Sequence, residues 1–142
     1  MNLTFKIMYL LIDPTDRKYN ILTLFDEKKL FSADYDRNVS GLVEAVDKFL
    51  RNKKLKPENL KGIFVIVGEG GFTSTRVATT VANSFIYVLG IAGLSISKKE
   101  SLTPQKLIKK LKKQNKGEFI FASYSGKPNI TKLSFWKKLW KR

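Results

Sequence analysis

The sequence predicts an α/β fold in which a mixed sheet of about five strands carries helices on its flanks. Two features of the chain lead to this prediction. Three strand-like segments follow one another near the N-terminus, and strands then alternate with helix-like segments through the middle of the chain. With 142 residues, of which 43% are hydrophobic, the chain is long enough for one domain with a substantial core.

The first three strands are expected at residues 5–12, 19–25 and 30–35. Residues 26–29, with the sequence Asp-Glu-Lys-Lys, predict a hairpin turn between the second and third strands. The three strands are therefore expected to form a meander, which a helix then follows.

The first long helix is expected at residues 41–52, with Asn38 or Ser40 as its N-terminal cap. Its apolar residues recur at helical spacing and share one face, which Val43 broadens; they are Leu42, Val46, Phe49 and Leu50. A basic connection follows, in which residues 57–60 predict a short helical turn.

A fourth strand at residues 63–67 ends at a glycine cluster, and a Thr/Ser-rich turn then opens a second helix at about 74–89. Glycine permits positive φ and close approach of the backbone, and the first N–H groups of a helix favour anions. The candidate residues of this glycine turn are Gly68, Gly70, Gly71, Thr73 and Arg76. No Walker lysine follows them, so the segment is not a P-loop. The favoured interpretation is a structural turn between strand and helix, in which Arg76 bridges the helix and a partner; contact of the glycines with a nucleotide is the alternative.

The second helix carries an apolar stripe that includes Ala78, Val81, Ala82 and Phe85. Small alanines let another helix approach closely, and a phenylalanine can anchor a contact. Additional apolar residues broaden the stripe to more than one face, which suggests burial on two sides. A stripe that packs only on the protein's own sheet is the competing interpretation.

The C-terminal part is expected to contain a short strand at 94–97, a third helix at 104–114 and strands at 118–125 and 130–134. Thr103 is the expected cap of the third helix, with Pro104 in its first position. Only three apolar residues mark the buried side of this helix: Leu107, Ile108 and Leu111.

The net charge of +15 is concentrated at the C-terminal end of the chain. Residues 1–97 hold 13 Lys and Arg against 10 Asp and Glu, whereas residues 98–142 hold 14 against 2. This asymmetry suggests a polyanionic partner. The candidate RNA contacts are Lys109, Lys110, Lys112, Lys113, Lys137, Lys138, Lys141 and Arg142. Because aromatic residues alternate with the last of these cations, the C-terminal segment could also dock on its own domain or on an anionic membrane.

The chain contains no histidine and no cysteine. Their absence excludes Ser–His and Cys–His nucleophile pairs and the common zinc sites, so no catalytic residue and no metal ligand is predicted. No apolar run approaches the ~20 residues that cross a bilayer, and no signal-peptide cleavage pattern follows the first strand. A cytoplasmic location is expected.

Four motifs in the same order resemble the bacterial TsaB (YeaZ) family. They are Tyr9–Thr15 (YLLIDPT), the turn at 68–76 (GEGGFTSTR), Leu89-Gly90-Ile91, and Leu94-Ser95-Ile96-Ser97. The resemblance spans residues 5–97 and implies the actin-like ATPase (ribonuclease H-like) fold. It implies an N-terminal lobe of this type at 1–97 and a basic remnant at 98–142, as in a shortened, single-lobed member. The chain departs from the family pattern at Glu69, Gly71 and Ser74, and it lacks the family's histidine in the first long helix.

The resemblance implies a non-catalytic subunit that stabilises the catalytic TsaD-type subunit during threonylcarbamoyl transfer to adenosine 37 of tRNA. The ATPase subunit of the same complex is a second implied partner, and ATP and the metal are expected on the partner subunits. In this family the two long helices form half of a four-helix bundle with the sister subunit or in a homodimer. That bundle would place Leu42, Val46 and Phe49 of the first helix in the interface, together with the stripe of the second. Replacing Ala82 with Glu is then expected to abolish pairing and leave a folded monomer.

Two other functions remain open from the sequence. The first is a small basic RNA-binding protein that acts without the complex and depends on the C-terminal lysines. The second is a kinase-like remnant that binds ATP at Asp13 and the glycine turn, although Glu69 places a carboxylate beside that turn.

Overall fold

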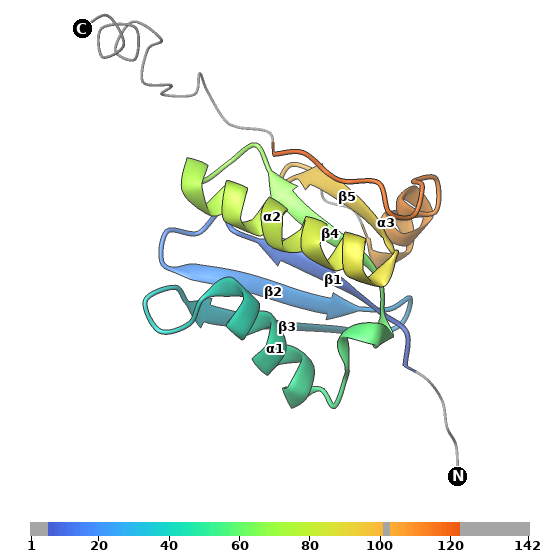
Figure 1. The fold of residues 1–142 in the computed structure, drawn as a ribbon, viewed down its shortest axis with the longest axis horizontal. Helices are drawn as coiled ribbons and strands as arrows, with labels where there is room; N and C mark the ends of the chain where they lie inside the picture. The colour runs from blue at the N-terminus through green and yellow to red at the C-terminus, as the bar shows by residue number, and fades with distance from the viewer. Residues whose placement is uncertain (1–5, 101–102, 123–142) are drawn as a thin grey trace, which may run out of the picture.

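The computed structural model describes residues 6–100 and 103–122. These residues form a five-stranded sheet in the order β3-β2-β1-β4-β5, with helices on both faces (Figure 1). The elements are β1 (Met8–Asp13), β2 (Tyr19–Phe25), β3 (Leu30–Asp36), α1 (Leu42–Asn52), the 3₁₀ turn η1 (Pro57–Asn59), β4 (Leu60–Val67), α2 (Phe72–Leu89), β5 (Ala92–Ser97) and α3 (Pro104–Leu111). The predicted α/β class, the mixed sheet and its five strands are confirmed.

The pairing of the strands explains why the sheet is mixed. β1, β2 and β3 pair antiparallel as the predicted meander, while β1 pairs with β4, and β4 with β5, in parallel. The turn between β2 and β3 is closed by Asp26, whose carboxylate accepts the N–H groups of Lys28 at 2.7 Å and Lys29 at 2.6 Å. Parallel neighbours require a crossover connection. α1 therefore lies between β3 and β4 in the chain, and α2 lies between β4 and β5.

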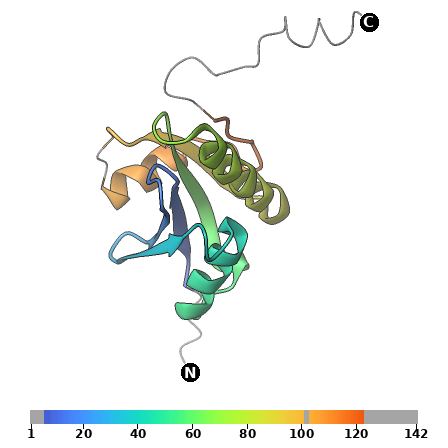
Figure 2. The same ribbon diagram turned by 90° about the vertical axis from the view of Figure 1, so that its left-hand side faces the viewer.

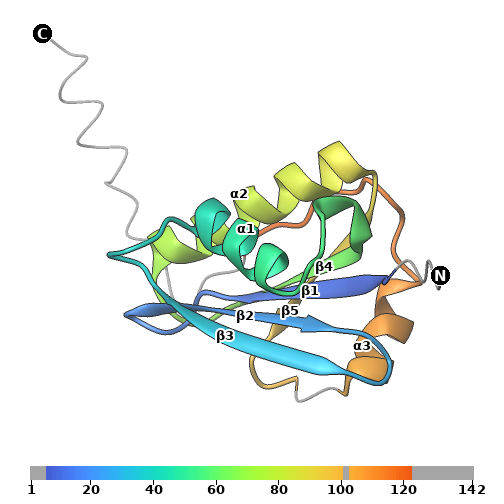
Figure 3. The ribbon, with the colours of Figure 1, turned by 90° about the horizontal axis from the view of Figure 1, so that it is seen from below.

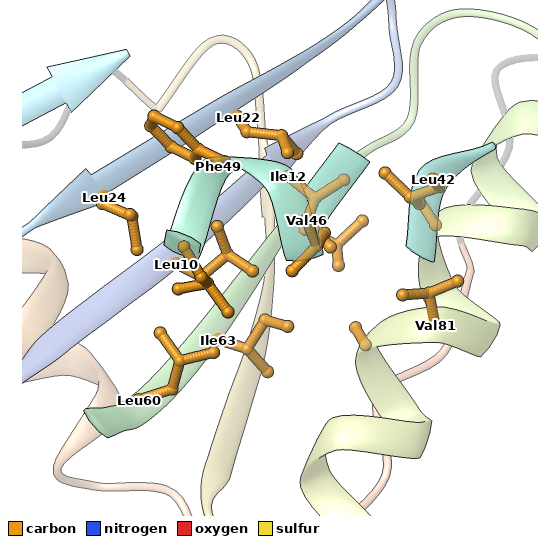
Figure 4. Close-up of a cluster of buried hydrophobic side chains, with 14 of the residues drawn as sticks. Leu10, Ile12, Leu22, Leu24, Leu42, Val46, Phe49, Leu60, Ile63 and Val81 are labelled. Atoms are coloured by element: carbon orange, nitrogen blue, oxygen red, sulfur yellow. The ribbon is translucent and has the colours of Figure 1, made fainter. Parts of the chain in front are cut away.

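α1 and α2 cover one face of the twisted sheet, and α3 lies on the opposite face (Figures 2 and 3). The larger core lies under α1 and α2 and includes Leu10, Ile12, Leu22 and Leu24 from the first two strands. Figure 4 shows Val46 and the neighbouring apolar residues of α1 directed toward these strands. Because α1 and α2 cover the sheet closely, 10 of the 21 buried residues of this core have no exposed surface.

The smaller core lies under α3 and is built around three aromatic rings. Tyr9, Phe25 and Phe64 pack with ring centroids 5.6 to 6.4 Å apart. The three predicted apolar residues of α3 complete this cluster. Gly62 allows α3 to approach the sheet, since a Cβ atom there would lie 2.1 Å from Leu111 Cδ2. α3 therefore packs on the sheet of residues 1–97, and the described residues show no separate core beyond position 97.

Several predicted boundaries need correction. Gly41 caps α1 without a side-chain hydrogen bond, so the prediction of Asn38 or Ser40 as the cap was wrong. Ser40 instead accepts a hydrogen bond from Lys48 Nζ at 3.3 Å. The predicted cap of α3 is confirmed, because Thr103 accepts the N–H of Lys106. The strands β4 and β5 begin earlier than predicted, at Leu60 and Ala92. The helix α2 also begins earlier, at Phe72, and α3 ends three residues sooner, at Leu111.

Residues 118–122 do not form the strand that was predicted at 118–125. The segment is held by a side chain instead: Asn83 Nδ2 donates to the carbonyl of Ile120, and the Ile120 N–H donates to Asn83 Oδ1, both at 2.9 Å. Ile120 is thereby buried in the larger core. The remainder of that predicted strand, and the one at 130–134, lie outside the described residues. Within the described part of the chain, no helix is long and apolar enough to cross a membrane.

The first testable prediction concerns Ala82, which has 0% of its surface exposed. The change Ala82→Glu would place a carboxylate in the larger core and destabilise the protein by more than about 3 kcal/mol. The matched change Ser84→Glu, at an exposed position of the same helix, should cost less than about 0.5 kcal/mol. Urea unfolding of both variants measures the difference. Equal stability of the two variants would contradict the placement of Ala82 in the core.

Candidate functional site

The first candidate site is a groove between α1 and α2, with a volume of about 670 Å³. Its walls come from both helices and include Val43, Val77, Val81 and Phe85. Two of these side chains are well exposed, Val43 by 62% and Val77 by 45%. Glu44 and Asp47 of α1 also line the groove. Each of these acids pairs with a cation of its own helix, Glu44 with Lys48 at 3.4 Å and Asp47 with Arg51 at 3.1 Å. The helix pair therefore presents an apolar strip with ion pairs along its α1 margin.

The structure places the seven predicted partner contacts mostly beneath this groove. Six of them are buried in the larger core: Leu42, Val46, Phe49, Ala78, Val81 and Ala82. Phe85 is partly buried and packs against the same core. Leu42, Val46, Val81 and Phe85 also line the groove, whereas Phe49, Ala78 and Ala82 do not. The expectation that Ala82→Glu leaves a folded monomer is therefore corrected, because this position has no surface to offer a partner.

The glycine turn joins β4 to α2 in a conformation that only glycine adopts easily. Gly68 has φ +89° and Gly70 has φ +83°, as the sequence predicted for a turn with positive φ. Gly70 also lies against the β1–β2 turn, since a Cβ atom there would be 2.7 Å from Thr15 Cα. Gly71 is the N-cap residue of α2. Gly68 thus permits the positive φ of the turn, and Gly70 in addition allows the two turns to pack together at the end of the sheet.

Hydrogen bonds fix the β1–β2 turn at the same end of the sheet. Asp13 Oδ1 accepts the N–H of Thr15 at 2.9 Å and its hydroxyl at 2.6 Å. Thr15 Oγ1 in turn accepts a hydrogen bond from Lys98 Nζ at 3.0 Å, which links β1 to the end of β5. The N–H groups of Tyr19 and Lys18 donate to the Asp16 carboxylate and hold the pKa of this group below its usual range.

Thr73 and Arg76, the remaining residues of the predicted glycine-turn site, lie in the first two turns of α2 and are exposed. The guanidinium of Arg76 lies 5.6 Å from the ring centroid of Phe72. A contact of this arginine with phosphate or with a partner stays a prediction. Among the described residues, no group of three or more Asp, Glu, His or Cys is arranged to hold a metal ion.

The four predicted RNA-contacting lysines of the third helix region lie at α3 and just after it, and all are exposed: Lys109, Lys110, Lys112 and Lys113. One of them is paired, because Lys110 Nζ lies 2.7 Å from Glu100 Oε2. Its hydrogen bond is the main cause that lowers the pKa of Glu100. The helix α3, which carries the first two of these lysines, lies on the face of the sheet opposite to α1 and α2 (Figure 3). The other four predicted contacts, Lys137, Lys138, Lys141 and Arg142, lie outside the described residues.

Two polar residues escaped the sequence reasoning. Asn20 lies in β2 with only 7% of its surface exposed, and Arg37 follows β3. One signal was present, since Asn20 takes the position that alternation with Leu22 and Leu24 assigns to the core face. The role of Arg37 had no such signal, because its partners are backbone carbonyls that only the fold brings near it.

Comparison with solved structures confirms the fold. The chain is similar to YeaZ from Pseudomonas aeruginosa, with a TM-score of 0.57 and 20% sequence identity, over 64% of this chain and 44% of that chain. It is also similar to an uncharacterized protein with similarity to peptidase YeaZ, from the same organism, with a TM-score of 0.55 and 20% identity, over 64% of this chain and 43% of that one. No protein-family model and no curated protein matches the sequence.

The comparisons test the predicted resemblance to YeaZ and the predicted single lobe. The similarity in structure to YeaZ is confirmed, and with it a single lobe of the actin-like ATPase type. The matched region spans less than half the length of either Pseudomonas chain. At 20% identity this likeness establishes the fold, and it does not establish an activity or a partner.

The second testable prediction separates the two roles of the glycine turn. Gly68→Ala adds only backbone strain, because nothing lies within 4 Å of the new Cβ atom, and should cost about 1–2 kcal/mol. Gly70→Ala adds an overlap with the backbone of Thr15 to the same strain and should cost clearly more. Thermal unfolding of both variants provides the measurement. If Gly68→Ala and Gly70→Ala lower the free energy of unfolding equally, the close contact of Gly70 with Thr15 does not restrict the residue at position 70.

Proposed function

We propose that this protein is a non-catalytic subunit that binds and stabilises a TsaD-type catalytic subunit through the groove between α1 and α2. In this proposal the complex transfers threonylcarbamoyl to adenosine 37 of tRNA in the cytoplasm. The observation that carries the proposal is an exposed apolar groove between two helices, on a fold similar to that of YeaZ.

The chemistry of the groove favours a helical partner. Val43 of α1 and Val77 of α2 both line the groove, as does Phe85 further along α2, so that apolar side chains of a second helix pair can pack against them. Valines with about half of their surface exposed gain from such burial at ~25 cal/mol per Å². The ion pairs on the α1 margin, Glu44 with Lys48 and Asp47 with Arg51, would meet charged groups of the partner and fix its orientation.

The proposal assigns no chemistry to this chain. It leaves the transfer reaction, its metal and its ATP to the catalytic subunit and to the ATPase subunit of the same complex. The absence of histidine and cysteine from the sequence supports this division, since the usual nucleophiles and metal ligands are missing. A homodimer through the same groove is the form that we expect when the sister subunit is absent.

The third testable prediction uses a matched pair of changes on one helix. Val77→Asp places a carboxylate in the groove beside Glu44 and Asp47 and should weaken binding of the TsaD-type subunit of the same organism at least about tenfold. Val88 is 76% exposed and does not line the groove, so the variant Val88→Asp should bind the TsaD-type subunit as tightly as the unchanged chain does. Titration calorimetry with the purified subunits measures both.

The same variants then enter a reconstitution with unmodified tRNA, threonine, bicarbonate, ATP and the other subunits of the pathway. We expect the yield of modified adenosine to depend on the unchanged chain and on Val88→Asp, and to fall with Val77→Asp. Equal modification without this chain would contradict the accessory role. Unchanged binding by Val77→Asp would instead exclude the groove as the interface.

A second function is supported by a different observation, the exposed lysines at α3 on the face opposite to the groove. A small basic protein that binds RNA through this face would act without the complex. Such binding would weaken steeply with salt, since each phosphate contact releases counterions.

The fourth testable prediction addresses this second function. If RNA binds there, changing Lys109 and Lys113 to Gln should reduce the slope of log affinity against log salt by about 0.7–0.9 per lost contact. The control changes Lys54 and Lys56 to Gln, which removes the same charge from the connection after α1. Fluorescence anisotropy with labelled tRNA between 50 and 300 mM salt gives the slopes. Identical slopes for the two double variants would contradict a defined RNA site on α3.

A further inference from the structure

We propose that a second pocket, between β2, the β3–α1 connection and the N-terminus of α2, binds a small ligand through a phosphate or carboxylate group. The pocket has a volume of about 430 Å³, within the range of small-molecule sites. Its polar lining consists of Asn20, Arg37, Ser40, Thr73 and Ser74. This inference does not rest on the proposed partner role, because none of these polar residues lines the groove, although Gly41, Leu42 and Val77 border both hollows.

Asn20 is the first observation that points to a ligand. Its side chain is directed to the face of the sheet that carries α1 and α2, as Leu22 and Leu24 of the same strand are. It is 93% buried, because its exposed fraction is 7%, and its amide makes no hydrogen bond to any described residue. Its polar atoms are not fully enclosed, so they remain open to the pocket that Asn20 lines. Buried polar side chains nearly always have a partner, and each exception requires an explanation. A ligand in the pocket would supply that partner.

The N-terminus of α2 supplies the second observation. Its N-cap residue is Gly71, which offers no side-chain acceptor to the first turn. The hydroxyls of Ser74 and Thr75 do not replace a cap, since both donate to the carbonyl of Gly71, at 3.1 and 2.9 Å. The backbone N–H groups of Thr73 and Ser74 therefore have no acceptor among the described residues, and both residues line the pocket. Such N–H groups, at the positive end of an 18-residue helix, favour an anion.

Arg37 gives the pocket a fixed positive charge. Its Nη2 donates to the carbonyls of Pro14 at 2.6 Å and Asp16 at 2.5 Å, which holds the guanidinium in place. Its Nε is buried and has no hydrogen-bond acceptor among the described residues. No Asp or Glu lines the pocket, in contrast to the groove between the helices. The charge balance of the pocket therefore favours an anion as well.

Ser40 adds a further donor. It is 5% exposed, and its Oγ accepts a hydrogen bond from Lys48 Nζ at 3.3 Å. Because the oxygen is engaged as an acceptor, the hydroxyl proton remains available to the ligand. Donors from β2, the β3–α1 connection and α2 thus converge on one pocket. Leu42, Phe72 and Val77 form its apolar wall and would contact the rest of the ligand.

The test is a titration of the whole chain, followed by ¹H–¹⁵N NMR, with inorganic phosphate in one arm and acetate in the other. Ionic strength is held constant with sodium chloride. We expect saturable shifts of the Asn20 side-chain amide and of the Thr73 and Ser74 backbone amides in at least one arm. The arm that saturates at the lower concentration identifies the oxyanion. Shifts confined to surface lysines, or shifts that do not saturate in either arm, would overturn the proposal.

A pair of variants makes the test specific. Gly71→Asp places a carboxylate at the N-cap of α2, where φ −72° and ψ 142° suit a capping residue. The new side chain would accept the N–H groups that we assign to the ligand, so affinity should fall at least tenfold while the melting temperature does not fall. Asn115→Asp, at an exposed position after α3, adds the same charge away from the pocket and should leave affinity unchanged. Equal losses in the two variants would show a general charge effect and contradict a defined site.

A third variant removes the buried amide itself. Asn20→Leu keeps the approximate volume of the side chain and abolishes its hydrogen-bonding capacity. We expect weaker anion binding at nearly unchanged thermal stability, because the amide makes no hydrogen bond to any described residue that the change would break. A loss of stability together with unchanged binding would show that the amide serves the fold and would overturn its assignment to the ligand.

Discussion

The parallel pairing of β1 with β4 at the centre of the sheet is the constraint on which the rest of the structure depends. Strands that run in the same direction cannot be joined by a tight turn, so the chain must cross over through helices that cover the sheet. The strand β4 consequently has seven of its eight residues buried, and both faces of the sheet carry a core. The same pairing brings the carboxyl ends of β1, β4 and β5 together, and with them Asp13, Gly68 and Lys98.

Because α1 and α2 pack on the sheet, only part of each helix stays accessible to other molecules. The regular apolar positions of both helices pack on the sheet, and four of those predicted for a partner, Leu42, Val46, Val81 and Phe85, also line the groove. Val43 and Val77 are well exposed there, so the apolar stripe and the interaction surface overlap without being the same set of residues. This distinction explains why a partner can be proposed for the helix pair although most of the residues first assigned to that contact belong to the core.

At the carboxyl end of the sheet, the requirements of packing and of binding meet in a small space. The glycine turn must lie against the β1–β2 turn, and Arg37 ties that turn to the end of β3 through backbone carbonyls. The result is a rigid frame around the start of α2, whose N–H groups lack a cap. The polar groups without partners in this frame are the ones assigned to the proposed anion, since the frame holds them in place at no further entropic cost.

Local sequence patterns determined most of the elements, because alternation and helical spacing report burial within one strand or helix. They placed β2, α2 and the Thr103 cap of α3, and they predicted positive φ at the glycine turn. Only the tertiary structure decided contacts between distant segments. Hydrogen bonds with Asn83 hold Ile120, which lies 37 positions further along the chain, where the sequence predicted a strand. The environments of Asn20 and Arg37 also depend on the turns that lie beside them. Burial of a helix residue is likewise a property of its neighbours in space, which is why the sequence could predict an apolar face on each long helix but not which of its residues a partner could reach.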